Sequence, residues 1–177
     1  MTTPPDFVAG QILTAAQMSA VGTWLVKTQV VGSGVSSVAV TGAFSADYDN
    51  YLITYSNGSA SADTHISMIL GATTSGYYSA ISGNTWSNSA SNSGGTGQSN
   101  FTYAFSGFAT YGVNGAVLVQ SPFLAKYTLM TSHFVASFGS YASSGMLQNT
   151  TSYTGFTLTP NSGTLTGGTI RIYGYRL

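Results

Sequence analysis

Charge is what this sequence lacks most. Four Lys or Arg and four Asp are its charged residues, Glu is absent, and together they make up 5% of 177 residues. In an ordinary globular domain about a quarter of the residues are charged, which keeps the monomer soluble and protects sheet edges from pairing. We therefore expect this chain to bury much of its surface in an assembly, or to present a surface of hydroxyl and amide groups.

Other absences narrow the class of protein. Cys is absent, which excludes disulfides and thiolate metal sites. The net charge is zero, so the basic surface of a nucleic-acid-binding protein is missing. No apolar run approaches the roughly 20 residues of a membrane-spanning helix, and the first residues lack the basic segment of a signal peptide. We expect a chain made in a cytoplasm, with no nucleic-acid partner and no membrane insertion.

The residues that usually carry catalysis are few. Asp63 and His65 share one face if they lie on a strand, but they lack a third metal ligand, and a hydrated pair near a strand start is the simpler interpretation. Asp47 and Asp49 fit a tight turn better than half of a calcium loop, since no Glu completes the loop. With two His and no G-x-S-x-G motif, we expect no enzyme activity, no metal and no cofactor.

A short helix is predicted near the N-terminus. Thr14 can cap it, with Gln17 completing a capping box, and Leu13 and Met18 occupy the two positions of a hydrophobic staple. A helix over roughly residues 15–21 is too short to be stable alone in water. It must therefore dock, either on its own domain or on a partner.

The rest of the chain is typical of β-structure. About nine or ten short strands, separated by clusters of Gly, Asn and Ser, predict an antiparallel β-sandwich or jelly-roll-like body. We expect residues 1–23 to form an N-terminal segment and residues 24–177 the sandwich. The segments that favour strands are 24–31, 35–40, 51–56, 65–71, 100–108, 116–123, 127–138, 155–160 and 169–175. In the segment 100–108, alternation predicts that Phe101, Tyr103 and Phe105 share one face.

Residues 82–100 form a low-complexity stretch in which Trp86 is the one large apolar residue. The composition is typical of a long surface loop or a hairpin tip. Tyr77, Tyr78 and Trp86 flank or occupy this stretch, and aromatic rings of this kind could stack on a sugar at a host surface. Packing in the core or in an interface would use the same residues.

The last strand carries two of the four basic residues. Arg171, Tyr173 and Tyr175 point to one side if residues 169–175 are a strand. An interface or surface strip, with arginine packed on aromatic rings, explains this pattern better than contact with an anion or a glycan.

Two segments resemble those of a known group of proteins. FVAGQILTAAQM (7–18) is similar to an N-terminal segment, F-x-x-G-x-x-L-T-A-A-x-M-N, of tail, fibre and other minor virion proteins of tailed phages, although Ser19 stands where that pattern has Asn. LTGGTIRIYGYR (165–176) looks like the closing strand of such proteins, and YDNYLITYS and TTSGYYS are also similar. The resemblance implies a phage structural protein of the minor tail type.

Together these observations predict a virion protein whose N-terminal segment attaches it to the particle. The anchor residues would be Phe7, Leu13, Thr14, Gln17 and Met18. The body would associate with copies of itself, as a trimer by analogy with phage fibres, and with other virion proteins. It would display Tyr77, Tyr78 and Trp86 towards the host. A capsid decoration protein or head fibre is one alternative, and a carbohydrate-binding module is another.

Overall fold

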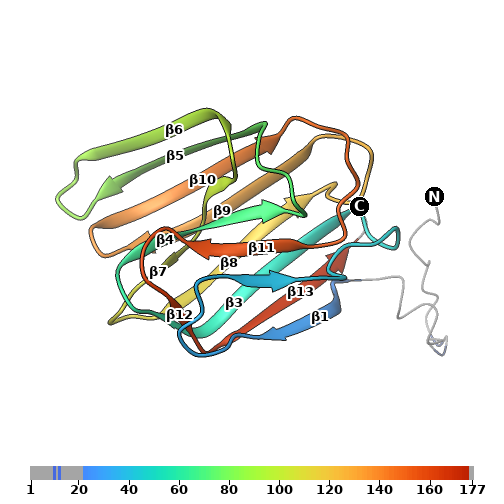
Figure 1. Cartoon of the computed structure of the whole chain (residues 1–177), viewed down its shortest axis with the longest axis horizontal. Helices are drawn as coiled ribbons and strands as arrows, with labels where there is room; N and C mark the ends of the chain where they lie inside the picture. The colour runs from blue at the N-terminus through green and yellow to red at the C-terminus, as the bar shows by residue number, and fades with distance from the viewer. Residues whose placement is uncertain (1–9, 11, 13–21, 176–177) are drawn as a thin grey trace.

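Two antiparallel sheets packed face to face make up the body of the protein (Figure 1). The computed structural model describes residues 10, 12 and 22–175. These residues form thirteen strands: β1 (Trp24–Val30), β2 (Val38–Val40), β3 (Asn50–Ala60), β4 (Thr64–Leu70), β5 (Tyr77–Thr85), β6 (Ala90–Gln98), β7 (Phe101–Gly107), β8 (Val113–Gln120), β9 (Thr128–Ala136), β10 (Gly139–Leu147), β11 (Phe156–Pro160), β12 (Leu165–Thr166) and β13 (Thr169–Tyr175).

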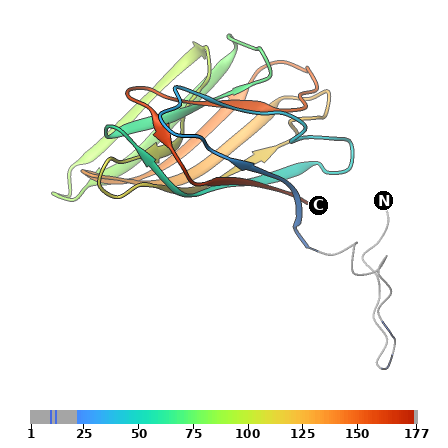
Figure 2. The same ribbon diagram turned by 60° about the horizontal axis from the view of Figure 1, so that its bottom comes forward.

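The two sheets are unequal in size. The nine-stranded sheet runs β1-β13-β3-β8-β9-β10-β5-β6, with β12 beside β3, and the four-stranded sheet runs β2-β11-β4-β7. Figure 2 shows the two layers from the side. The expected all-β, antiparallel architecture is confirmed, and its two sheets are consistent with a β-sandwich. Its strands divide unequally, whereas a jelly roll has eight strands in two sheets.

The core lies between the two layers and follows the period-two alternation of the strands. Ile66, Met68 and Leu70 alternate along β4, and all three are fully buried. Phe101 and Phe105 are buried as well, but the prediction that Tyr103 shares their face is wrong. A bulge in the β4–β7 pairing shifts the register, so that Tyr103 packs against His65 instead.

The N-terminal expectations lie largely outside the described residues. This holds for the helix over residues 15–21 and for the anchor residues, which are Phe7, Leu13, Thr14, Gln17 and Met18. The part of the chain that the structure describes contains no helix, and therefore none that could cross a membrane.

The low-complexity stretch over residues 82–100 is not a long loop. Most of it belongs to β5 and β6, which pair in register from Asn84 with Ala90 to Ser79 with Gly95. The hairpin-tip alternative is correct, since the chain reverses between Thr85 and Ala90. Backbone pairing explains the difference, because a ladder needs no apolar side chains when β10 supports β5 from its other side.

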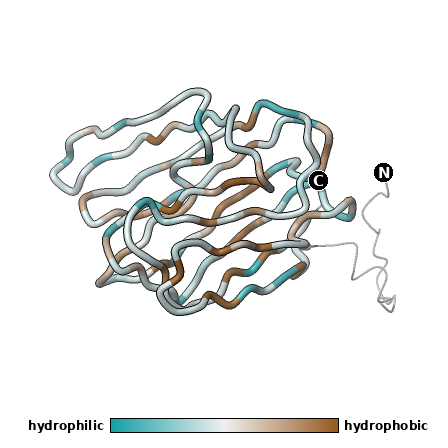
Figure 3. Tube along the Cα trace, in the orientation of Figure 1, coloured by the Kyte–Doolittle hydropathy of each residue, from teal (hydrophilic) through white to brown (hydrophobic). Residues whose placement is uncertain are grey.

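The hairpin of β5 and β6 extends beyond the cover of the small sheet, at the top left of Figure 1. Every residue of β6 is at least partly exposed, which is why its sequence holds no large apolar residue. Tube colouring by hydropathy shows the contrast: hydrophobic residues gather along the central strands and are sparse on this hairpin (Figure 3).

The strand registers give the body two distinct ends. The first strand, β1, begins beside the end of β13, since Trp24 pairs with Gly174. Gly139 pairs with Thr85 at the opposite end of the large sheet, where the turns after β5, β7 and β9 lie together. Figures 1 and 2 agree on this arrangement. We call these the chain end and the hairpin end.

Candidate functional site: an aromatic cleft at the hairpin end

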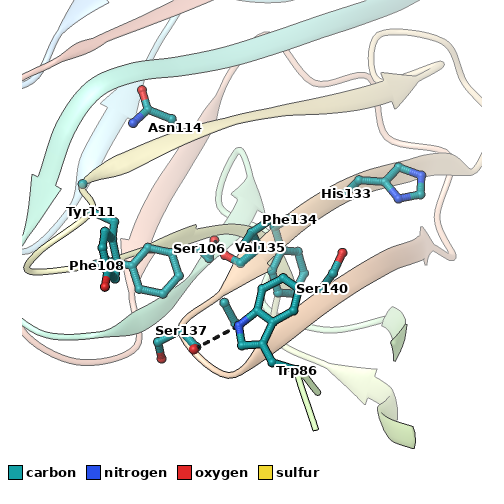
Figure 4. A pocket seen from close by; sticks show the side chains of 12 residues that line it. Trp86, Ser106, Phe108, Tyr111, Asn114, His133, Phe134, Val135, Ser137 and Ser140 are labelled. Atoms are coloured by element: carbon teal, nitrogen blue, oxygen red, sulfur yellow. Dashed lines mark hydrogen bonds between the residues drawn. The ribbon is translucent and has the colours of Figure 1, made fainter. Parts of the chain in front are cut away.

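A cleft of about 550 Å³ opens at the hairpin end (Figure 4). Three turns contribute to it, namely those that connect β5 to β6, β7 to β8, and β9 to β10. Its aromatic lining residues are Trp86, Phe108, Tyr111 and Phe134. The volume falls within the range of roughly 300–1,000 Å³ that is usual for small-ligand sites.

The cleft lies where the large sheet splits. β8 and β9 pair as far as Ala116 and His133, and beyond this pair they separate. At this level β7 approaches β9 from the small sheet, and Ser106 Oγ donates to the Val135 carbonyl at 2.8 Å. The Ser106 hydroxyl thus gives a hydrogen-bond partner to a β9 carbonyl beyond the end of the β8–β9 pairing, which stabilises the separation of the two strands.

Trp86 forms one wall and is held in place although its side chain is 63% exposed. Its indole Nε1 donates to the Ser137 carbonyl at 3.1 Å, and its backbone N donates to the Phe138 carbonyl at 3.0 Å. Both bonds tie the β5–β6 turn to the β9–β10 turn. Because the indole N–H is already paired, a ligand would meet the face of the ring.

The β7–β8 turn forms the opposite wall. Phe108 and Gly112 exchange two backbone hydrogen bonds, Phe108 N to Gly112 O at 3.0 Å and the reverse bond at 3.2 Å. Between them Tyr111 is 75% exposed, and its ring meets the Phe108 ring edge-on at 6.1 Å. The Asp63 carboxylate accepts from Ala109 N at 3.3 Å and braces the same turn.

The floor beside Trp86 is built from stacked rings. Phe134 lies on Tyr141 with ring centroids 5.6 Å apart and an angle of 20° between the planes, and Phe138 meets Tyr141 edge-on. Tyr141 is 2% exposed, and its hydroxyl has no hydrogen-bond partner among the described residues. Its contribution to this region is therefore ring packing.

The lining of the cleft is electrically neutral. Among the described residues that line it there is no Lys, Arg, Asp or Glu. Besides the Trp86 indole and the Tyr111 hydroxyl, the polar side chains of the lining are Ser106, Asn114, His133, Ser137 and Ser140. The Asn114 amide oxygen accepts from Asn57 N at 3.0 Å, which orients the amide so that its NH₂ group faces away from Asn57.

The three residues expected at a host-contact surface do not come together. Trp86 lines the cleft, as described. The prediction for Tyr77 is wrong: it is fully buried, its ring packs edge-on against Phe101 at 4.8 Å, and its hydroxyl accepts from Leu70 N at 2.8 Å. Tyr78 is half-buried on the outer face of the large sheet, near the chain end. Adjacent strand residues point to opposite faces, which separates this pair.

The side chains of Asp63 and His65 make separate contacts. Asp63 braces the β7–β8 turn, whereas the His65 ring packs on Tyr103 with centroids 5.0 Å apart. Burial lowers the pKa of His65, which favours its neutral form. The described residues contain no group of three or more His, Asp or Glu that could hold a metal ion.

Arg171, Tyr173 and Tyr175 do share one face of β13, as the alternation predicts. They lie half-buried on the outer face of the large sheet. The Arg171 guanidinium donates to Ser56 Oγ at 3.2 Å across β13 and β3. Arginine thus bonds to a neighbouring hydroxyl on its own sheet.

Two aromatic residues of the cleft, Phe108 and Phe134, are not predicted by the sequence. They lie in or beside different turns, and no local spacing connects them to Trp86. Their juxtaposition follows from the strand registers alone.

Comparison with known proteins adds no relative to this picture. No protein-family model matches the chain, and no curated protein or solved structure is significantly similar to it.

Proposed function

We propose that this protein is a structural component of a phage virion, of the minor tail or fibre type. It attaches to the particle by residues 1–23 and presents the hairpin end to the host surface. The observation that carries the proposal is the polarity of the body: the chain enters at one end, and the aromatic cleft opens at the other. The resemblance of residues 7–18 and 165–176 to virion proteins supports the same role.

The neutral surface supports assembly with further copies, which we propose to be a trimer. On the outer face of the large sheet, Arg171 is the one charged side chain that the described strands present. Leu25, Val30 and Leu129 are exposed on that face. Neutral hydroxyls and scattered apolar side chains suit contact with another protein subunit better than permanent contact with water.

Binding without bond cleavage is the activity we propose. Hydrolysis of a polysaccharide ordinarily needs a pair of carboxyl groups that flank the scissile bond. The nearest described carboxylate to the cleft, Asp63, is engaged with the backbone of the β7–β8 turn. A capsid decoration protein or head fibre would share the body, and would differ in copy number.

Quantitative mass spectrometry of purified particles tests the proposal. A tail or fibre role predicts a few to tens of copies per particle, whereas decoration would require hundreds. Absence of the chain from particles would refute the virion role.

Deletion of residues 1–22 tests the attachment segment. We expect the shortened chain to retain its β circular-dichroism spectrum and to be missing from particles. Normal incorporation of the deletion variant would show that attachment uses another part of the chain.

The mass of the full chain in solution, measured by light scattering, tests the assembly proposal. A monomeric mass would contradict it.

A further inference from the structure

We propose that the cleft at the hairpin end binds a neutral saccharide, with Trp86 as its stacking surface. The inference rests on the display role proposed above, because a host-surface ligand is useful only at an end that faces away from the particle. It goes further by naming the site and the chemical class of the ligand.

The first argument is the state of Trp86. An exposed indole is ordinarily free to choose among several rotamers, and a ligand that fixes it must offset that lost freedom. Here the bond to the Ser137 carbonyl fixes the ring before any ligand arrives. The bond leaves the ring face as the exposed contact surface. Axial C–H groups on one face of a sugar ring pack well on such a surface.

The second argument is the opposite wall. Tyr111 stands 75% exposed on a turn closed by two backbone bonds and braced by Asp63. The labelled side chains in Figure 4 place Tyr111 and Phe108 on one side of the cleft and Trp86 with Phe134 on the other. A ligand between the walls could thus contact aromatic rings on both sides without rearrangement of the turns.

The third argument is charge. A nucleic acid or an acidic polysaccharide would require Lys or Arg, since phosphate and carboxylate groups bind best to cationic donors. The described lining residues include neither. Ser137 and Ser140 also line the cleft, and a purely apolar ligand would offer their hydroxyl groups no hydrogen-bond partner. Neutral saccharides combine apolar ring faces with hydroxyl groups and match both features.

The experiment titrates the full-length protein with defined oligosaccharides. Saturation-transfer NMR and Trp fluorescence would be recorded with neutral glucose, mannose, galactose and N-acetylglucosamine oligomers at millimolar concentrations. Polygalacturonate and heparin serve as the anionic probes. We expect at least one neutral oligomer to bind and the anionic probes to fail. Binding of the anionic probes alone, or of no neutral oligomer, overturns the inference.

Two variants test the position of the site. Trp86→Ala should weaken binding at least tenfold, and Trp86→Phe should recover part of the loss because it restores an aromatic face. Tyr127→Ala is the matched control, since Tyr127 is 51% exposed beside the start of β9 at the chain end. If Tyr127→Ala weakens binding as much as Trp86→Ala does, the cleft is not the site.

Particle incorporation separates this inference from the proposed function. Trp86→Ala should join particles normally while it loses saccharide binding. Normal incorporation of a wild-type chain that binds no saccharide would overturn the inference alone. Saccharide binding by a chain that is absent from particles would overturn the virion role alone.

Discussion

Two buried tyrosines allow a sharp test of how hydroxyl groups stabilise this fold. Tyr77 and Tyr141 are 0% and 2% exposed. The Tyr77 hydroxyl accepts from Leu70 N at 2.8 Å, beyond the last β4–β7 pair, Met68 with Phe101. The Tyr141 hydroxyl has no partner among the described residues. The same substitution, Tyr to Phe, should therefore have opposite consequences at the two positions.

In Tyr77→Phe the buried Leu70 N–H loses its acceptor, which costs about 1–3 kcal/mol of unfolding free energy. In Tyr141→Phe a buried and unpaired hydroxyl is removed, so the unfolding free energy should stay within about 0.5 kcal/mol of wild type or rise. For a chain of this size 1 kcal/mol shifts the Tm by about 2–4 °C.

The assay is urea unfolding followed by circular dichroism at a single protein concentration, because an assembly makes stability depend on concentration. Equal losses in the two variants would refute the reasoning. A large loss in Tyr141→Phe alone would show that its hydroxyl is paired in solution.

Two further predictions concern pH and packing. Burial raises the pKa of Tyr55 and Tyr77 to about 12. The unfolded chain loses these protons near pH 10, whereas the folded chain keeps them until about pH 12. The free energy of unfolding is therefore unaffected below pH 10 and falls as the pH rises towards 12, by about 2–3 kcal/mol for each tyrosine. Urea midpoints across this range should fall, and less steeply in Tyr77→Phe; a flat profile would contradict the burial argument. Gly83→Ala would place a Cβ in steric conflict with the Ser140 carbonyl oxygen. It should cost at least about 1–3 kcal/mol, whereas the exposed neighbour Ser82→Ala should be nearly neutral by the same assay.

The strands that could be predicted from the sequence are those with an apolar alternation. All nine predicted segments overlap observed strands, and most of them put large side chains on the core face and so repeat at a period of two. Tyr103 shows the limit of this logic. A bulge in β7 changes which face a residue occupies, and nothing in the local sequence marks it.

The strands that the sequence does not predict lack that signal for a physical reason. β6 has the sequence ASNSGGTGQ and β10 has GSYASSGML, so small and hydroxyl-bearing residues fill positions where strands usually show Val or Ile. Their stability comes from backbone pairing with neighbours on the large sheet. A low-complexity stretch suggests a loop because the sequence reveals the side chains but not the backbone hydrogen bonds that stabilise these strands.

The cleft could be predicted only in part. Trp86 is the one large apolar residue in a polar stretch, and that contrast identifies it correctly as exposed. The prediction fails for Tyr77 because the sequence beside a polar stretch does not show whether an aromatic side chain points to the core or to the solvent. The opposite wall, with Phe108 and Tyr111, depends on long-range register, which one sequence cannot supply.

In this protein, side-chain hydroxyl groups form hydrogen bonds to backbone groups that charged and amide side chains often form in other proteins. Where the ladders end or split, Ser106 Oγ pairs the Val135 carbonyl, Tyr55 donates to the Gly167 carbonyl at 2.9 Å, and Tyr77 receives the Leu70 N–H. These bonds satisfy backbone groups without placing a charge near the core. The scarcity of charge is therefore compatible with a well-paired sandwich. It also leaves the cleft neutral, because the chain has few ionic side chains to place there, and a neutral cleft framed by fixed aromatic rings is suited to a ligand that carries hydroxyl groups of its own.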